Sequence, residues 1–217
     1  VILMIGTERG LCSNFNKRLI EKSFDWIKSH HLSSYQIWAM GQRIVQDLER
    51  RQVNISWKKS LPTGNLLDYK DAFLLTKDWL AKYETFEFDR FVIMFNQVSK
   101  GSQTEFHTLT LFPFEFHLPV TEDDNKKGIW PPSIIETPPE GIYHQIIQHS
   151  LAASFYRVLL QSAAAEHSTR YTIMEDAKDN ADDIMLELNQ VINTERKKKI
   201  TREMQALAAA SGLLDKD

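Results

Sequence analysis

The chain has 217 residues, of which 42% are apolar and 25% charged, and its net charge of -3 lacks the basic excess of nucleic-acid-binding domains. No apolar run reaches the length of a membrane span. The single cysteine, Cys12, excludes an internal disulfide and a cysteine-based zinc site, and it fits a reducing compartment.

The first 112 residues alternate between strand and helix patterns. Short apolar or β-branched runs predict strands at residues 1–5, 35–40, 53–57, 91–97 and 105–112. Amphipathic segments between them predict helices at residues 14–28, 42–51 and 65–83. This order predicts an α/β fold, with a Rossmann-like, largely parallel sheet that is flanked by helices on both faces.

The rest of the chain divides by its helix-breaking residues. Six of the seven prolines lie from Pro113 to Pro139, whereas residues 143–211 contain neither Gly nor Pro. Such a stretch predicts one long helix, of about 100 Å at 1.5 Å per residue. We therefore expect three parts: an α/β domain at residues 1–112, a Pro-rich irregular connection at 113–142, and a long C-terminal coiled-coil helix at 143–217.

Apolar or small residues recur along the long helix at alternating spacings of three and four. They stand at positions 147, 151, 155, 158, 162, 165, 174, 177, 181, 184, 188, 191, 200, 204, 207 and 211. This spacing indicates a coiled-coil seam, of which we single out Met174, Ala177, Ala181, Ile184, Leu188 and Val191. The alternative is a stripe that covers the chain's own domain, but that domain is too short to cover the whole helix.

Charge on the long helix is polarised. An acidic stretch consists of Glu175, Asp176, Asp179, Asp182, Asp183 and Glu187. A basic collar follows, which consists of Arg196, Lys197, Lys198, Lys199 and Arg202. Consecutive cations face different sides of a helix, so the collar is either a solvated helix end or a ring that meets an acidic surface around the helix.

The segment Gly6 to Ser13 follows the first strand, where open α/β sheets often bind phosphate. It lacks both the Gly-x-Gly-x-x-Gly spacing and the Gly-Lys-Ser/Thr of a P-loop. We expect Glu8, Arg9 and Leu11 to crowd an approaching anion. The segment is then a tight turn at Gly10, with Ser13 or Asn14 capping the next helix, and binds no nucleotide.

The remaining reactive side chains favour no active site. Cys12 stands at a helix start, where a thiol can be activated, but no histidine is near it in sequence, which favours a buried, inert thiol. The histidines show no metal-ligand spacing, and no Gly-x-Ser-x-Gly elbow occurs. We therefore expect no catalytic, cofactor or metal site.

Two segments resemble the γ subunit of F-type ATP synthases, the central rotor shaft. Gly6-Thr-Glu-Arg-Gly-Leu-Cys-Ser13, with Asn14-Phe-Asn16 after it, is similar to the family's Ser-Asp-Arg-Gly-Leu-Cys-Gly stretch. The second segment matches the family's spacing of Ser, Glu, Arg, Met, Ala and Asn, followed by Ile-Thr-x-Glu. Its residues are Ser162, Glu166, Arg170, Met174, Ala177, Asn180, Ala181, Leu188, Asn193, Arg196, Ile200, Thr201 and Glu203.

The sequence departs from the family pattern near its end. Ala206 and Ala210-Ser211 replace an acidic residue and a Gly-Ala pair, and Lys197 replaces a Gln. We therefore expect a divergent, alternative-type γ subunit. The family's N-terminal helix pairs antiparallel with the C-terminal helix and would precede Val1, so we expect it to be the partner that this sequence lacks.

The resemblance implies a rotor that couples ion flow, of protons or sodium, to ATP synthesis or hydrolysis at β subunits. The implied partners are the α and β subunits of the catalytic hexamer, the ε subunit and the membrane c-ring, at the cytoplasmic face of the inner membrane. The implied β-contact residues are the basic collar with Thr201 and Glu203, and the implied bore tip is Leu207, Ala210, Leu213 and Leu214. Glu136 stands where the family has an acidic residue near the rotor ring.

As a γ subunit the chain would itself catalyse nothing. The alternative is an α/β nucleotide- or small-ligand-binding domain with a helical oligomerisation arm. A ligand site in the α/β domain distinguishes the two, since only the alternative requires one.

Overall fold

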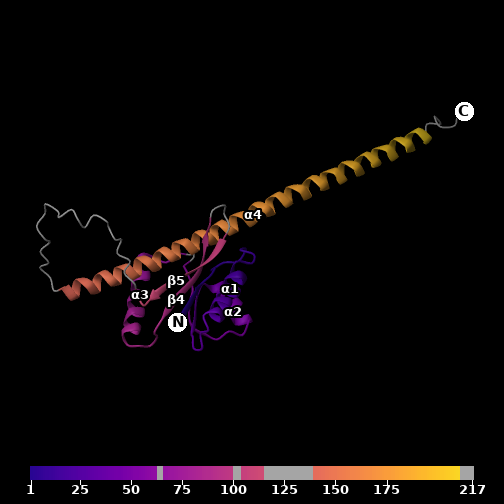
Figure 1. Ribbon diagram of the computed structural model, residues 1–217. Coiled ribbons are helices and arrows are strands. Elements are labelled where there is room, and N and C mark those ends of the chain that lie inside the picture. The colour runs from indigo at the N-terminus through magenta and orange to yellow at the C-terminus, as the bar shows by residue number, and fades with distance from the viewer. Residues whose placement is uncertain (63–65, 100–103, 115–138, 211–217) are drawn as a thin grey trace, which may run out of the picture. The chain divides into compact units, whose positions relative to one another are not determined.

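A computed structural model of the chain describes residues 1–62, 66–99, 104–114 and 139–210. They form two compact units that meet in the chain at Arg170 and Tyr171. The elements are β1 (Ile2–Ile5), α1 (Phe15–Ser29), β2 (Ile37–Met40), α2 (Gln42–Arg50), β3 (Ile55–Lys59), α3 (Tyr69–Glu84), β4 (Phe91–Val98), β5 (Thr104–Phe112) and α4 (Pro139–Ala210) (Figure 1). None of the helices in these ranges has the apolar length that a membrane crossing requires.

The sheet has five strands in the order β3-β2-β1-β4-β5. β1 pairs in parallel with β2 and β4, β2 pairs in parallel with β3, and β4 pairs antiparallel with β5. The predicted largely parallel sheet is therefore confirmed. β1 and β2 are buried at every position because helices cover both faces, which explains their unbroken apolar sequence.

Alternate side chains of β1 enter different cores, because successive residues of a strand point to opposite faces. Ile2 and Met4 pack with α1 and α2 on one face. Leu3 and Ile5 pack with α3 and the first part of α4 on the other. Figure 1 shows α1 and α2 together on one side of the sheet and α3 on the other.

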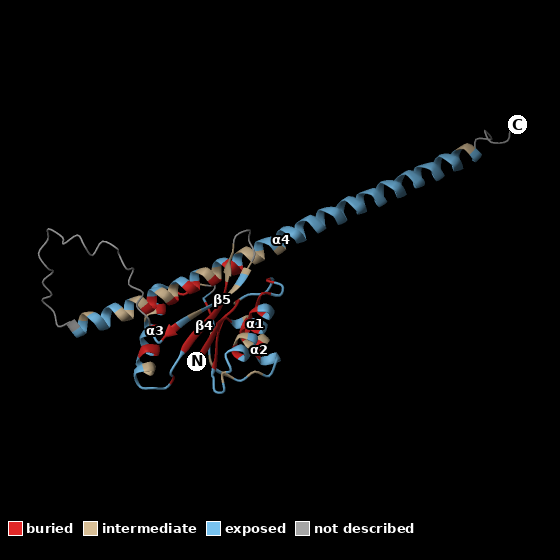
Figure 2. Cartoon of the chain, in the orientation of Figure 1, coloured by how far each residue is buried: buried red, intermediate tan, exposed pale blue. Residues whose placement is uncertain are grey.

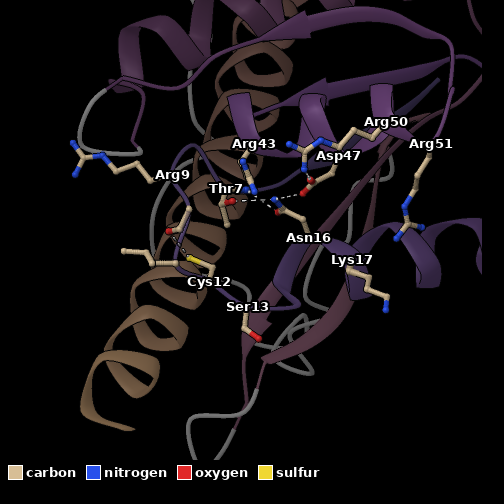
Figure 3. A pocket seen from close by; sticks show the side chains of 12 residues that line it. Thr7, Arg9, Cys12, Ser13, Asn16, Lys17, Arg43, Asp47, Arg50 and Arg51 are labelled. Carbon is tan, nitrogen blue, oxygen red and sulfur yellow. Dashed lines mark hydrogen bonds and ion pairs between the residues drawn. The ribbon is translucent and has the colours of Figure 1, made fainter. Parts of the chain in front are cut away.

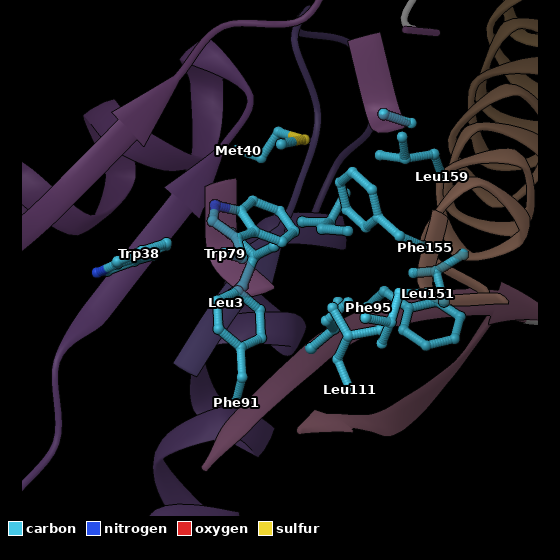
Figure 4. Close-up of a cluster of buried hydrophobic side chains, with 14 of the residues drawn as sticks. Leu3, Trp38, Met40, Trp79, Phe91, Phe95, Leu111, Leu151, Phe155 and Leu159 are labelled. Atoms are coloured by element: carbon cyan, nitrogen blue, oxygen red, sulfur yellow. The ribbon is translucent and has the colours of Figure 1, made fainter. Parts of the chain in front are cut away.

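Aromatic rings fill the core under α3 and α4. Trp79 of α3 is fully buried and lies 4.9 Å, between ring centroids, from both Phe91 of β4 and Phe155 of α4. Figure 4 shows Leu151, Phe155 and Leu159 of α4 pointing at this cluster. Burial of such side chains supplies about 1.5–3 kcal/mol each, so α4 is held to the sheet mainly by the hydrophobic effect.

α4 begins at Pro139, earlier than the start predicted at residue 143. We call residues 139–170 its proximal stretch and residues 171–210 its distal stretch. In the proximal stretch Ile147 is half-buried, and the later regularly spaced residues, Leu151, Phe155, Val158, Ser162 and Ala165, are buried. The prediction that these positions belong to a coiled-coil seam was wrong, because they pack against the chain's own α/β domain.

The distal stretch keeps the same spacing, but its side chains are exposed throughout residues 174–207. Figure 2 shows the change along α4, from buried and intermediate residues to exposed ones. Large apolar side chains remain open to solvent there, among them Ile184, Leu188 and Val191. The expected seam in this stretch therefore has no partner among the described residues.

Candidate functional site

The segment from Gly6 to Ser13, which we call the β1 corner, leads from β1 into α1. Gly6 is required there, because a Cβ on it would lie 2.5 Å from Cβ of Ile44 and 2.8 Å from Oδ1 of Asn16. Gly10 does not take the unusual backbone conformation that we predicted. Instead, the positive φ angles fall on Leu11 (64°) and Ser13 (43°). Asn14 is the N-cap residue of α1, but its side chain makes no capping hydrogen bond.

A buried amide fixes the start of the β1 corner. Oδ1 of Asn16 accepts a hydrogen bond from the backbone N–H of Thr7 at 3.1 Å. Nδ2 of Asn16 donates to the Thr7 hydroxyl at 3.0 Å and to Oδ2 of Asp47 at 3.2 Å. Asn16 is 5% exposed, so these bonds join β1, α1 and α2 in a nearly dry environment.

Glu8 does not obstruct the β1 corner, contrary to our expectation. Its Oε2 accepts hydrogen bonds from the backbone N–H groups of Gln42 and Leu61, both at 2.8 Å. The carboxylate therefore caps the N-terminus of α2, where the helix dipole favours a negative charge. It is absent from the residues that line the neighbouring pocket.

That pocket has a volume of about 320 Å³ and lies between the β1 corner, α1 and α2. Figure 3 shows the hydrogen-bonded Thr7, Asn16 and Asp47 within it, with long basic side chains around them. Its lining residues are Thr7, Arg9, Gly10, Leu11, Cys12, Ser13, Asn16, Lys17, Arg43, Asp47, Arg50 and Arg51.

The crevice where open α/β sheets bind ligands is filled by α4. Strand order reverses between β1 and β4, and ligands of such sheets bind beyond the carboxyl ends of the strands at this point. Here Ala165 of α4 packs against Cys12 and Phe15, with Val98 at the end of β4 beside them. Nδ2 of Asn96 also donates to the carbonyl of Phe15 at 3.4 Å.

A buried ion pair follows Ala165 on α4. Glu166 has a side chain that is 3% exposed, and it forms a short contact with Arg170 one turn later. Nη2 of Arg170 also lies 3.5 Å from Sγ of Cys12. These residues join the two sequence segments that carry the γ-subunit resemblance, since Cys12 belongs to one and Glu166 and Arg170 to the other.

The environment of Cys12 makes it a poor nucleophile. Burial raises the pKa of its thiol, and the nearby Glu166 carboxylate raises it further, which outweighs the opposing effect of Arg170. The thiol also lies 3.7 Å from the carbonyl oxygen of Gly10. The interpretation of Cys12 as a buried, inert thiol fits this geometry.

The predicted β-contact residues lie together on the distal stretch of α4, and all of them are exposed. Lys198 pairs with Glu195 at 2.8 Å, and Lys199 pairs with Glu203 at 4.0 Å. Arg196, Lys197 and Arg202 have no ion pair with any residue that the structure describes. The sequence did not distinguish these two groups of cations within the collar.

The other predicted site residues are either exposed or outside the described part of the chain. Met174, Ala177, Ala181, Ile184, Leu188 and Val191 are exposed on the distal stretch, as are Leu207 and Ala210 of the predicted bore tip. Leu213, Leu214 and Glu136 lie outside the described residues. Within the described ranges, no three His, Cys, Asp or Glu side chains gather as metal ligands would.

A family model described as ATP synthase matches residues 1–211 of the chain. The ATP synthase gamma chain of Chlorobium phaeobacteroides is 27% identical over 220 residues, which cover 99% of this chain and 73% of that one. The chain belongs to the ATP synthase γ-chain family. The γ chain of Trichlorobacter lovleyi is 25% identical over 215 residues, covering 97% of this chain and 72% of its own length.

Solved structures agree with this assignment at the level of the fold. The chain resembles one from the Euglena gracilis mitochondrial ATP synthase, OSCP/F1/c-ring, with a TM-score of 0.63 at 14% identity, covering 98% of this chain and 72% of that one. A chain of the central stalk/c-ring structure from Tetrahymena thermophila matches with a TM-score of 0.58 at 17% identity. It covers 82% of this chain and 75% of that one. The family match and these relatives make the protein a γ chain of an ATP synthase.

Proposed function

We propose that this γ chain transmits torque and itself catalyses nothing. The observation that carries the proposal is the family match over residues 1–211, together with the filling of the ligand crevice by Ala165, Cys12 and Phe15. Within the described residues, Ala165 of α4 occupies the β1–β4 switch point, which weighs against the nucleotide- or small-ligand-binding alternative. The chain would act as part of the ATP synthase complex at the cytoplasmic face of the inner membrane.

The proximal and distal stretches of α4 suit different parts of a rotor. The proximal stretch is bound to the sheet by a buried aromatic core, so the α/β domain would form a rigid foot near the c-ring and the ε subunit. The distal stretch exposes the seam residues, which fits pairing with an antiparallel helix, and we propose the family's own N-terminal helix in that role. The three-part division at residues 112 and 142, the tip at Leu207 to Leu214, and Glu136 at the ring remain predictions.

Within the basic collar, we propose that Arg196, Lys197 and Arg202 contact acidic or polar loops of the α and β subunits. They have no intrahelical ion pair among the described residues, so their charge is available to a partner, whereas Lys198 and Lys199 already pair with Glu195 and Glu203. Thr201 donates its hydroxyl to the carbonyl of Lys197 at 2.9 Å and would only accept hydrogen bonds from a partner.

Paired substitutions in the assembled complex test this proposal. Arg196→Gln/Lys197→Gln should lower ATP-driven ion pumping relative to ATP hydrolysis. Lys198→Gln/Lys199→Gln removes the same charge from adjacent positions and should have a smaller effect. Measurement of both rates in reconstituted vesicles gives the coupling ratio. Equal ratios for the two variants would contradict the division of the collar, and unchanged pumping in both would contradict a role for its charge.

A further inference from the structure

The pocket beside the β1 corner concentrates positive charge on a chain whose net charge is -3. Five of its lining residues are cationic and one is a carboxylate, Asp47. The cations come from the β1 corner, α1, α2 and the residue after α2, and they are Arg9, Lys17, Arg43, Arg50 and Arg51. Figure 3 shows Arg43 and Arg50 beside the hydrogen-bonded Thr7, Asn16 and Asp47, with Arg9 and Lys17 at opposite sides of the pocket.

Internal ion pairs do not neutralise this charge. Arg50 lies 3.6 Å from Asp47, and Arg51 lies 3.7 Å from Glu21, and both arginines are exposed. Arg43 donates to the neutral Gln46 at 3.3 Å. Arg9 and Lys17 form no ion pair with a described residue. The pocket therefore keeps a net positive charge whose natural complement is an anion.

The shape and donors of the pocket favour a compact oxyanion. Guanidinium groups present forked N–H donors that match the geometry of phosphate oxygens. The first turn of α1 borders the pocket and contains no acidic residue. Its N–H dipoles therefore add to the positive electrostatic potential in the pocket. A volume of about 320 Å³ accommodates a phosphate group easily. We propose that this pocket is a binding site for a phosphate-type oxyanion.

The same loop connects this pocket to α4. Cys12 lines the pocket, while its Sγ lies 3.5 Å from Nη2 of Arg170 and 4.0 Å from the carbonyl oxygen of Glu166. An anion bound among the lining residues of the pocket would restrain the loop and reduce opening around Cys12. The site thus couples anion occupancy to the attachment of the proximal stretch, and it does not depend on the rotor function.

Cys12 is the chain's only cysteine, so the rate of its labelling reports on this corner. We would label the full chain with a thiol reagent at constant ionic strength while potassium phosphate replaces potassium chloride. Labelling should slow about tenfold at a phosphate concentration of about ten times Kd, because only the unoccupied loop opens. Titration calorimetry with inorganic phosphate gives Kd independently.

Matched variants decide whether the pocket is responsible. Lys17→Gln and Arg43→Gln should remove the protection, whereas Lys22→Gln and Arg18→Gln remove equal charge from α1 outside the pocket and should keep it. Lys17 is exposed, so its single variant stays folded and keeps the test valid. Absence of saturable protection by phosphate, or equal loss in pocket and control variants, would overturn the proposal.

Two further arms distinguish the source of the phosphate group. ATP would compete with inorganic phosphate for the pocket if the natural ligand is a nucleotide phosphate. Vesicles of phosphatidylglycerol in phosphatidylcholine would compete if it is a lipid headgroup. Competition that disappears in Lys17→Gln identifies a nucleotide phosphate or a lipid headgroup as the occupant. Protection by inorganic phosphate without competition from either identifies the free ion. Each of these results supports the site, and a nucleotide occupant would in addition favour the nucleotide-binding alternative over the proposed function.

Discussion

The proximal and distal stretches of α4 have the same apolar spacing but different environments. Leu151, Phe155 and Val158 are 0–1% exposed, whereas Leu188 and Val191 are 56% and 59% exposed. The spacing of three and four specifies an amphipathic helix, but it does not specify what covers the apolar face. In the proximal stretch that cover is the chain's own sheet and α3, and in the distal stretch it must come from outside the described residues.

The small residues of the two stretches also differ in their packing neighbours. Ser162 and Ala165 stand in the predicted coiled-coil seam, as Ala177 and Ala181 do. In the structure Ala165 packs against Cys12 of the β1 corner and Phe15 at the start of α1. A small residue on a helix can therefore mark a close approach without specifying whether the neighbour is a helix or a loop.

The largest expected difference between the stretches is in stability. Leu151→Ala should lower the free energy of unfolding by about 2–5 kcal/mol, because Leu151 is fully buried and its loss leaves a cavity. Leu188→Ala, the matched change in the distal stretch, should shift it by less than about 0.5 kcal/mol. Urea unfolding followed by tryptophan fluorescence measures both, since Trp79 lies in the affected core. Similar losses for the two variants would show that the distal seam is covered within the chain.

Removing a charged side chain should likewise lower stability in the proximal stretch and not in the distal stretch. Arg170→Ala breaks the buried Glu166–Arg170 ion pair and should cost about 3 kcal/mol, because removing one partner of a buried ion pair is strongly unfavourable. Arg196→Ala should leave the unfolding midpoint unchanged, since Arg196 is exposed and has no ion pair with a described residue. The same urea titration compares them. A stable Arg170→Ala variant would mean that the Glu166–Arg170 pair contributes little to holding α4.

The exposed distal seam should also change the state of association. The chain alone should self-associate through this stretch, because its exposed apolar stripe is longer than soluble monomers usually tolerate. Leu188→Gln should weaken association about tenfold, or about 1.4 kcal/mol, by placing a polar group in the seam. Leu186→Gln is the matched control, since two residues along a helix turn the side chain away from the seam. Light scattering that reports a monomeric wild-type chain would contradict this expectation.

The sequence allowed most of the fold to be predicted, because each strand and helix carries its own periodic pattern. Each of the five predicted strands overlaps an observed strand, although β3 lies two residues later than predicted. The β1 corner was harder, since its conformation depends on long-range contacts. The Glu8 carboxylate accepts hydrogen bonds from the backbone N–H groups of Gln42 and Leu61, and the Asn16 amide donates one to Asp47. No local sequence pattern indicates these long-range hydrogen bonds. The positively charged pocket was missed for the same reason.

The smallest expected effect concerns Cys12 and high pH. Burial raises the pKa of this thiol above its usual value of 9.0, so the folded chain keeps a proton that the unfolded chain loses first. The contribution of Cys12 to stability is therefore complete below about pH 9 and is lost as the pH rises through the pKa of the folded state. The slope of the unfolding free energy against pH that Cys12 causes cannot exceed about 1.4 kcal/mol per pH unit, the limit for one proton.

Cys12→Ala removes this pH-dependent contribution. The difference in unfolding free energy between wild type and variant should therefore be constant from pH 7 to 8.5 and should shrink above pH 9. Val98 contacts the same cluster without titrating, so Val98→Ala should show a difference that does not change with pH in this way. A pH-independent difference for Cys12→Ala would mean that the thiol ionises as easily in the folded chain as in the unfolded one.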